Sequence, residues 1–298
     1  MVRLNPFSEI YSLANSGTNI DKYANLIDFP RYIDVELTNT CNLQCIMCPT
    51  GCNVSTRPKG FMSHGTFNRI LQECYRYECH IRFIRWGEPL LHPELTGFIG
   101  AVKGNGLMCH INTNGMFIDD EFITKIIRMK LDSIKFSFQG VTKDEYEKYR
   151  RGAEWEKLIL NIKRLYDFRW KKKFPFIGIG TTISGNNRDN AVTDINNFKA
   201  KMLQISDEVI VGTTRNIINP EYSGKTPRCP EMFDKLSVNW DGTVTACCSD
   251  WNNTLLVGDL NKSTLYDIWR GDAIDHYRKM IINKRHSELE PCKACLVR

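Results

Sequence analysis

Three closely spaced cysteines, Cys41, Cys45 and Cys48, are the residues of this chain best suited to redox or metal chemistry. They form a C-x3-C-x2-C loop directly after an apolar, β-prone run. Iron–sulfur cubanes are normally held by four cysteine thiolates, so a loop with three leaves one iron free to bind something else. An open coordination position separates reactive metal sites from structural ones. The spacing therefore indicates a reactive iron–sulfur cluster.

Two other interpretations of these cysteines are a zinc knuckle and a set of buried thiols. Zinc would need a fourth ligand at knuckle spacing, and Cys52 is the only spare cysteine nearby. Buried structural thiols are not expected to cluster in a loop flanked by polar and turn-forming residues such as Asn42, Gln44 and Pro49. Both observations favour the iron–sulfur cluster.

The cysteine loop resembles that of the radical S-adenosylmethionine (radical SAM) superfamily. In this superfamily the fourth iron of a [4Fe–4S] cluster chelates the amino and carboxylate groups of S-adenosylmethionine (SAM). An electron from the cluster then cleaves SAM to a carbon radical, which abstracts hydrogen from a substrate. The resemblance implies that Cys41, Cys45 and Cys48 ligate this cluster and serve catalysis, with SAM as a cofactor.

A second motif, Arg85-Trp-Gly-Glu-Pro89, resembles the Gly-Gly-Glu-Pro segment through which the superfamily contacts the SAM amino group. Trp86 replaces the first glycine, whereas Gly87, Glu88 and Pro89 match. An amino group bound to iron keeps protons for which a carboxylate such as Glu88 is an acceptor. The alternative is a simple turn, and the position relative to the cysteine loop favours SAM binding.

The resemblance implies further SAM contacts at the cysteine loop and near the ends of later strands. These expected contacts are Met47, Asn112, Thr113, Ser137, Arg150 and Arg151. Met47 stands where the family often has an aromatic residue on adenine, and a flexible thioether can also cover that ring. Gln139 departs from the family's Ser-x-Asp-Gly pattern. The alternatives are an Asn-Gly turn after Thr113 and a solvated helix end at Arg150 and Arg151.

A second group of cysteines lies in the last quarter of the chain, with spacing C-x17-C-x44-C-x2-C. Its members are Cys229, Cys247, Cys292 and Cys295. The group resembles the twitch domain, a shorter relative of the SPASM domain, which holds one auxiliary [4Fe–4S] cluster. The spacing is particularly similar to that of the deoxy-scyllo-inosamine dehydrogenases, radical SAM enzymes that oxidise an aminocyclitol alcohol. Cys248 could replace Cys247 as a ligand, because adjacent strand residues point to opposite faces. A structural zinc site is the other alternative.

The elements that must position these residues alternate between strands and helices. Candidate strands cover 32–37, 81–86, 108–112, 133–138, 177–183 and 208–211; candidate helices cover 63–77, 93–104, 119–129, 143–149 running on through 155–168, and 190–205. Such alternation predicts parallel strands with helical crossovers. Six strands suit a partial (β/α)6 TIM barrel better than a doubly wound sheet once the resemblance is considered. Chemistry then lies at the carboxyl ends of the strands, where the cysteine loop falls.

We expect three parts along the chain. Residues 1–30 form an N-terminal extension with a short helix near 6–14, residues 31–215 a radical SAM core, and residues 216–298 a twitch/SPASM-like auxiliary cluster domain. A linker with prolines and a glycine, 216–228, separates the last two. The small domain should contain a hairpin, 236–240 and 244–247, turning at Asp241-Gly242, followed by one helix near 263–282.

The composition is that of an ordinary globular protein, apart from its twelve cysteines. We find no secretory signal and no apolar stretch of membrane-spanning length, which predicts a cytoplasmic protein with reduced cysteines and no membrane partner. The net charge of +6 is modest, and the densest basic run, 169–173, reads as a solvated loop, so no nucleic-acid partner is expected. The remaining cysteines, Cys52, Cys74, Cys79 and Cys109, read as core or surface thiols.

The function that follows is alcohol oxidation of a small polar substrate such as a sugar or cyclitol. An auxiliary cluster without an open iron is suited to accept the electron, and an external one-electron reductant of flavodoxin or ferredoxin type is required. Arg215, just after the sixth strand, is a candidate base or substrate contact. The alternatives are modification of a peptide or protein side chain and a non-catalytic, metal-stabilised binding protein.

Overall fold

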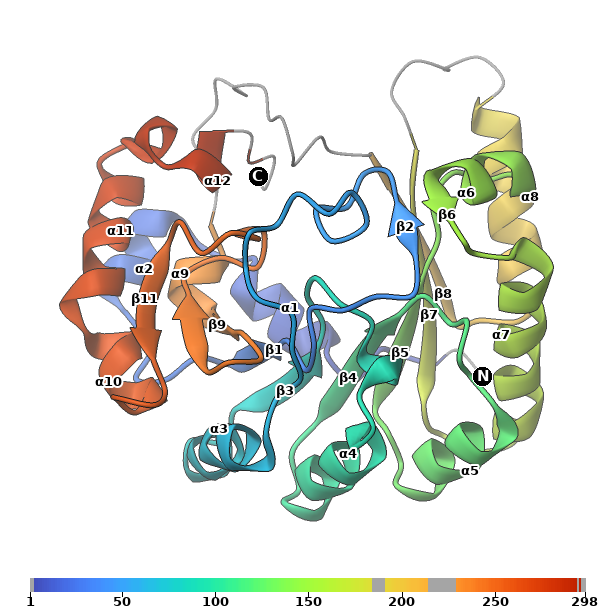
Figure 1. Cartoon of the computed structure of the whole chain (residues 1–298), viewed down its shortest axis with the longest axis horizontal. Coiled ribbons are helices and arrows are strands. Elements are labelled where there is room, and N and C mark those ends of the chain that lie inside the picture. The colour runs from blue at the N-terminus through green and yellow to red at the C-terminus, as the bar shows by residue number, and fades with distance from the viewer. Residues whose placement is uncertain (1–2, 184–190, 214–228, 294, 296–298) are drawn as a thin grey trace.

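The computed structural model describes residues 3–183, 191–213, 229–293 and 295. In this part of the chain a sheet runs in the order β11-β10-β9-β1-β3-β4-β5-β7-β8 (Figure 1). Its parallel core comprises β1 (Tyr32–Val35), β3 (His80–Phe83), β4 (Cys109–Thr113), β5 (Ser133–Ser137), β7 (Phe176–Ile183) and β8 (Glu208–Thr213). These six strands confirm the predicted partial barrel. Arg215 and the expected linker 216–228 lie outside the described residues.

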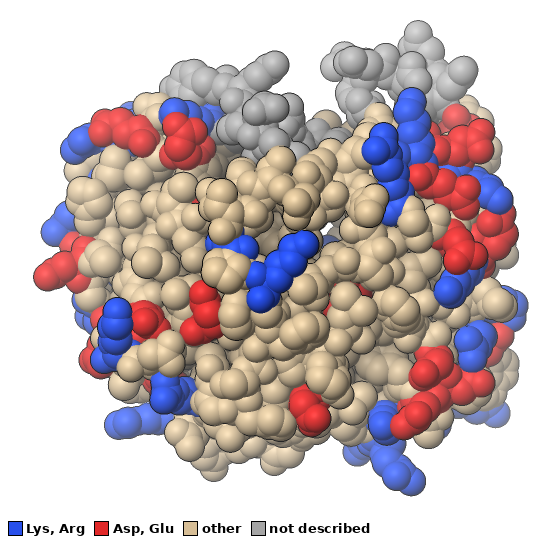
Figure 2. Space-filling view, viewed as in Figure 1, with Lys and Arg blue, Asp and Glu red and all other residues tan. Residues whose placement is uncertain are grey.

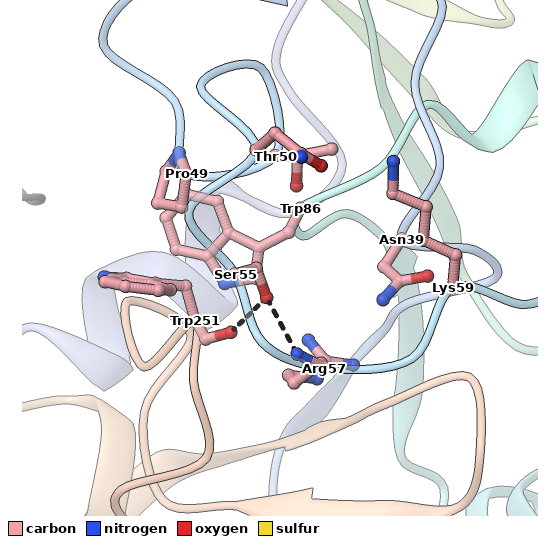
Figure 3. A pocket seen from close by; sticks show the side chains of 9 residues that line it. Asn39, Pro49, Thr50, Ser55, Arg57, Lys59, Trp86 and Trp251 are labelled. Atoms are coloured by element: carbon pink, nitrogen blue, oxygen red, sulfur yellow. Dashed lines mark hydrogen bonds between the residues drawn. The ribbon is translucent and has the colours of Figure 1, made fainter.

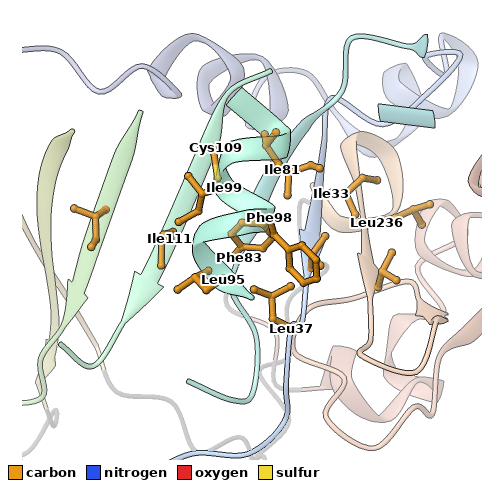
Figure 4. Close-up of a cluster of buried hydrophobic side chains, with 14 of the residues drawn as sticks. Ile33, Leu37, Ile81, Phe83, Leu95, Phe98, Ile99, Cys109, Ile111 and Leu236 are labelled. Atoms are coloured by element: carbon orange, nitrogen blue, oxygen red, sulfur yellow. The ribbon is translucent and has the colours of Figure 1, made fainter. Parts of the chain in front are cut away.

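Helices cover the outer face of the sheet (Figure 1). They are α3 (His64–Arg76), α4 (Leu95–Gly104), α5 (Asp120–Arg128), α7 (Trp155–Arg169) and α8 (Ala191–Met202). In α5, Phe122, Ile123, Ile126 and Ile127 are buried, which is the i, i+3, i+4 spacing of a helix with one apolar face. Figure 4 shows the equivalent contact of α4, where Phe98 packs with strand residues in the main core.

The long helix predicted over 143–168 is wrong. Two helices, α6 (Lys143–Tyr149) and α7, are separated by the short strand β6 (Arg150–Arg151). Strand β6 pairs with β2 (Gln44–Cys45) in the cysteine loop. Gly152 then adopts φ +88°, a conformation that glycine accepts readily and that ends the helical path. Pairing with a segment about a hundred residues away overrides the local helical preference.

The N-terminal segment contains two short helices and packs against the inner face of the barrel. The predicted helix is present as α1 (Ser8–Ala14), and a second helix, α2 (Asn19–Ala24), was not predicted. Phe7 is fully buried, and its ring packs edge-on against the imidazoles of His80 and His110. The six-residue α2 carries a capping box at its start, a local signal that the sequence analysis missed.

The C-terminal region extends the same sheet. Strands β9 (Lys235–Val238) and β10 (Thr243–Thr245) form the predicted hairpin, and β9 pairs parallel to β1. Strand β11 (Leu256–Asp259) was not predicted. The remaining helical segments are α9 (Glu231–Asp234), α10 (Leu265–Arg270), α11 (Asp272–Ile282), η2 (His286–Glu288) and α12 (Glu290–Lys293).

The single helix predicted over 263–282 is therefore wrong. Gly271 separates α10 from α11 with an extended backbone, and a Cβ at this position would lie 2.8 Å from the Asp267 carbonyl oxygen. Because the helix periodicity is similar on both sides of Gly271, the sequence pattern does not reveal the change of direction.

The charged residues give one further correction. Arg169, expected in a solvated loop, is buried, forms an ion pair with Asp207, and donates to the Pro175 carbonyl at 3.0 Å. On the face seen in Figure 2, cations and anions alternate around the rim, and the middle is mainly uncharged. No helix in the described ranges is both long and apolar enough to cross a membrane.

Candidate functional site

A cavity of about 300 Å³ lies where the cysteine loop meets the carboxyl ends of the parallel strands. All three loop cysteines line it, together with seven of the expected SAM contacts: Met47, Gly87, Glu88, Asn112, Thr113, Ser137 and Arg150. Pro89 is buried at the start of η1 (Pro89–Leu91), directly beyond the lining residue Glu88. Arg151 is exposed and does not line the cavity. The fold thus gathers into one space residues that come from four different strand ends.

The cysteine loop is held by backbone contacts that bring its thiols toward this cavity. Cys45 is the register partner of Arg150, and the Ile46 amide donates to the Tyr149 carbonyl at 3.0 Å. A Cβ on Gly51 would lie 2.4 Å from the Cys45 nitrogen, so only glycine allows this close return of the chain. The Leu43 amide lies 3.4 Å from the Cys41 sulfur, where it can donate to a thiolate.

Glu88 is the buried anion of the cavity. Its carboxylate accepts hydrogen bonds from the Thr113 hydroxyl at 2.8 Å, the Asn114 amide at 2.7 Å and the Leu90 amide at 3.1 Å. Burial raises the pKa of Glu88, and these three donors oppose the shift. Thr113 therefore orients Glu88, and its predicted contact with SAM stays a prediction.

Gly87 makes the approach of the Glu88 segment to the cysteine loop possible. A Cβ on Gly87 would lie 1.9 Å from the Thr38 carbonyl oxygen and 2.8 Å from that of Thr40. The Glu88 amide donates to the same Thr40 carbonyl at 2.9 Å. The two motifs recognised in the sequence are therefore in direct backbone contact.

Two cavity residues carry side-chain contacts that were not predicted. The side-chain amide nitrogen of Asn114 donates to Asn42 Oδ1 at 2.8 Å and lies 3.8 Å from the Cys41 sulfur. Its signal is its place in the Thr-Asn-Gly motif, of which only Thr113 is predicted to contact SAM. Gln139, noted only as a departure from the family, lines the cavity and accepts a hydrogen bond from Thr182 at 2.8 Å.

Arg150 and Arg151 have different positions despite being neighbours. The Arg150 guanidinium donates to the Phe138 carbonyl at 3.2 Å and lines the cavity. Its Nε is buried without a hydrogen-bond partner among the described residues, which suits it to an anionic ligand. The alternative of a solvated helix end is wrong for both, because they form β6, in which Arg151 is the exposed one of the two.

A second set of thiols gathers between β10 and the C-terminal segment. Burial raises the pKa of Cys229, and so do the neighbouring thiols of Cys292 and Cys295. Burial also raises the pKa of Cys292 to about 12, with Cys295 as the next cause. The pKa of Cys247 is raised mainly by its hydrogen bond with Cys248 and in part by Cys229. Cys229 is thus close enough to each of the other three expected auxiliary ligands to share an electrostatic interaction with it.

Cys248 has a different environment. Its sulfur lies 3.6 Å from the Lys235 ammonium, which also pairs with Asp34 at 2.9 Å and Glu231 at 2.6 Å. Asp34, Glu231 and Cys248 bring potential metal-ligand atoms within 4.8 Å of one another. Since the Lys235 ammonium pairs with all three, the cation at this position is the lysine itself.

This difference predicts unequal effects of two neighbouring substitutions. Cys247→Ala should lose the auxiliary cluster, so that anaerobically prepared protein falls from about eight to about four irons per chain. Cys248→Ala should keep about eight, because it removes a contact with Lys235 and a hydrogen bond with Cys247 but no expected ligand. Iron and sulfide analysis checks both. The reverse outcome would assign the ligand to Cys248.

Comparison with known families identifies the chain. A family model described as the radical SAM superfamily matches residues 35–195, more than half of the sequence. The chain belongs to the radical SAM superfamily. A second model, the SPASM iron–sulfur cluster-binding domain, matches residues 229–296. The protein is thus a radical SAM enzyme with a [4Fe–4S] cluster, SAM and an auxiliary iron–sulfur cluster as cofactors.

Distant relatives cover nearly all of the chain. A tungsten-containing aldehyde ferredoxin oxidoreductase cofactor-modifying protein from Pyrococcus furiosus is 23% identical over 312 residues, covering 88% of this chain and 87% of that protein. The SAM-dependent 2-deoxy-scyllo-inosamine dehydrogenase of Niallia circulans is 24% identical over 271 residues, covering 88% and 91%. The radical SAM and auxiliary regions therefore occur together in these relatives.

Solved structures share the fold. The crystal structure of BtrN in complex with AdoMet and 2-DOIA matches with a TM-score of 0.63 at 19% identity, covering 90% of this chain and 93% of BtrN. The structure of anSMEcpe with AdoMet and the Cp18Cys peptide matches with a TM-score of 0.63 at 13% identity, covering 88% and 87%. One was determined with a small molecule and the other with a peptide, so fold similarity leaves the substrate class undetermined.

The residues of the 300 Å³ cavity, called the SAM cavity below, fit the cofactors of the superfamily. The three loop cysteines are free thiols at the edge of a space that also contains a buried carboxylate and an arginine. When bound, the cluster and SAM supply a carbon radical that abstracts hydrogen. In this cavity Glu88 would be the acceptor, Arg150 the cation and Met47 a thioether wall for these cofactors.

Proposed function

We propose that this radical SAM enzyme is an oxidoreductase that oxidises an alcohol group of a small polar substrate such as a sugar or cyclitol. The similarity to 2-deoxy-scyllo-inosamine dehydrogenase over 88% of the chain and 91% of that enzyme carries the proposal. In it, Cys41, Cys45 and Cys48 ligate the SAM cluster, and Cys229, Cys247, Cys292 and Cys295 ligate the auxiliary cluster. An external one-electron reductant of flavodoxin or ferredoxin type supplies the electron.

A lysine on the inner barrel wall supports a polar substrate. The Lys135 stem crosses Gly178 and Gly180 on β7, because Cβ atoms there would lie 3.5 Å from Lys135 Cγ and 3.3 Å from Lys135 Cε, respectively. Gly180 is also the register partner of Ser137, which lines the SAM cavity. The side chain therefore runs toward the carboxyl end of the barrel and brings its amino group to the level of the cavity.

Lys135 has no hydrogen bond or ion pair within the described part of the chain, and burial lowers the pKa of its ammonium. Lys135 is only partly buried, so its amino group, which has no protein partner among the described residues, is accessible to a ligand. The two glycines let the Lys135 stem pass along β7 to the level of the cavity, so we assign Lys135 as a contact for a hydroxyl or other oxygen of the substrate. Arg215, the base candidate from the sequence, stays a prediction.

The decisive experiment uses reduced, anaerobically prepared protein and candidate sugars or cyclitols deuterated at the carbinol carbon. The expected result is deuterium in deoxyadenosine together with a ketone product. The second candidate function, modification of a peptide side chain, is favoured by the similarity to anSMEcpe, whose structure contains a peptide. Deuterium transfer from a labelled peptide and from no alcohol would replace the first proposal with the second. Protein that holds only zinc and does not cleave SAM would contradict both.

Once a substrate is known, Lys135→Met should raise its KM roughly 10- to 100-fold, since losing a charge-assisted hydrogen bond costs about 1.5–3 kcal/mol. SAM cleavage without substrate should be retained, and Lys135→Arg should recover part of the affinity. Lys143→Met is the matched control, because Lys143 is exposed and pairs with Glu156 on the surface. Steady-state kinetics check the result, and an unchanged KM in Lys135→Met would exclude a substrate contact.

A further inference from the structure

Arg85 connects the two cysteine sites. Its side chain has no exposed surface, and it lines the SAM cavity at the end of β3. Its guanidinium also reaches the hairpin of the C-terminal region, donating to the Cys247 carbonyl at 3.4 Å and the Asp250 carbonyl at 3.0 Å. The main chain of Arg85 thus lines the cavity of the first cluster, while its buried guanidinium contacts the backbone of an expected ligand of the second.

The charge around Arg85 is not balanced locally. Arg85 Nε lies 3.7 Å from Glu36, whose carboxylate already receives two hydrogen bonds from Arg57. Two guanidinium groups therefore share one carboxylate, and all three side chains are nearly or fully buried. This group has an excess of one positive charge on the side of the Cys247–Asp250 turn.

Adjacent residues reinforce the same junction. Trp86 lines the SAM cavity and also a small neighbouring cavity, which it shares with Arg57 and Trp251 (Figure 3). Ser55 donates to the Trp251 carbonyl at 3.5 Å, and Thr56 donates to Asn252 at 2.7 Å. Arg85 therefore holds the Cys247–Asp250 turn against the core, and residues 55–56 hold the next two residues, Trp251 and Asn252.

We propose that Arg85 is a positioning residue that fixes the auxiliary ligand Cys247 against the SAM cavity and makes the auxiliary cluster a better electron acceptor. The inference rests on the proposed assignment of Cys247 as a ligand. Reduction adds a negative charge to a cluster already surrounded by thiolates. A buried cation and hydrogen bonds beside the ligand stabilise the reduced state, and both raise the reduction potential of iron–sulfur clusters. The nearby Asp250 carboxylate accepts hydrogen bonds from the Thr254 and Leu255 backbone amides, whereas Arg85 donates to the Asp250 carbonyl.

The test measures the potential of the auxiliary cluster alone. In a chain with Cys41, Cys45 and Cys48 all changed to alanine, Arg85→Met should lower the auxiliary midpoint potential, as followed by redox titration with electron paramagnetic resonance. At the unmodified midpoint, the reduced-to-oxidised ratio should fall about tenfold, which corresponds to about 59 mV for one electron. Arg85→Lys should stay close to the unmodified value, because it keeps the charge. Arg85→Gln is a second neutral variant if Arg85→Met folds poorly.

Arg57→Met is the matched control. Arg57 shares Glu36 with Arg85, but its side chain makes no hydrogen bond to Cys247 or Asp250 in the described part of the chain. The auxiliary midpoint potential should therefore change much less in Arg57→Met than in Arg85→Met. An unchanged potential and spectrum in both neutral Arg85 variants, or equal shifts in the Arg57 and Arg85 variants, would overturn this inference alone. Absence of any cluster in the parent triple variant would overturn it together with the assigned auxiliary ligands.

Discussion

Replacing Cys45 with alanine is expected to abolish SAM cleavage. Cys45 is buried at the cavity and held by backbone pairing with Arg150, so no other thiol can take its position without breaking β2 from β6. With two thiolates left in the loop, the cubane loses its ligand set, and iron should fall from about eight to about four per chain. Deoxyadenosine formation and iron content, measured on the same reduced sample, check the prediction.

Cys52→Ala is the control for this substitution. Cys52 is also in the loop, but its thiol is exposed and donates weakly to the Ile46 carbonyl at 3.1 Å and the Cys45 carbonyl at 3.7 Å. We expect normal iron content and normal SAM cleavage. Loss of cleavage in Cys52→Ala with full activity in Cys45→Ala would show that the ligand set differs from the one proposed.

Gly87→Ala should have an effect of similar size through a single methyl group. Its Cβ would lie 1.9 Å from a backbone carbonyl, a contact that no side-chain rotation can relieve. The Gly87–Glu88 backbone must move away from the cysteine loop, and Glu88 with it. We expect destabilisation of about 1–3 kcal/mol or more and loss of measurable SAM binding to the reconstituted protein.

The matched control is Gly104→Ala, at the last residue of α4, where an added Cβ meets nothing within 4 Å. This change should leave SAM binding intact and keep or slightly raise stability, since alanine favours helix by up to about 1 kcal/mol over glycine. Thermal unfolding and equilibrium SAM binding distinguish the two variants. Full SAM binding by Gly87→Ala would contradict the close packing of the two motifs.

Local patterns in the sequence sufficed for much of the fold and the site. The alternation of short β-prone and longer amphipathic runs predicts the six parallel strands. A helix with one buried face repeats its apolar residues every three or four positions, and a buried strand is a short apolar run, so both patterns are local. The cysteine loop and Gly87–Pro89 are contiguous segments, so their spacing carries their chemistry. One error, the long helix over 143–168, arose where a distant partner decides the backbone, in the pairing of Arg150 with Cys45.

The amino-acid sequence alone determined which chemistry is available: three thiolates in one loop, a carboxylate after a glycine, and a second set of four cysteines. Only the tertiary structure decided which of these groups meet. The contact of Arg85 with Cys247 joins residues 162 positions apart, and that of Asn114 with Cys41 joins residues 73 apart. Such contacts depend on strand order and register, which the whole core sets together, and no local spacing encodes them.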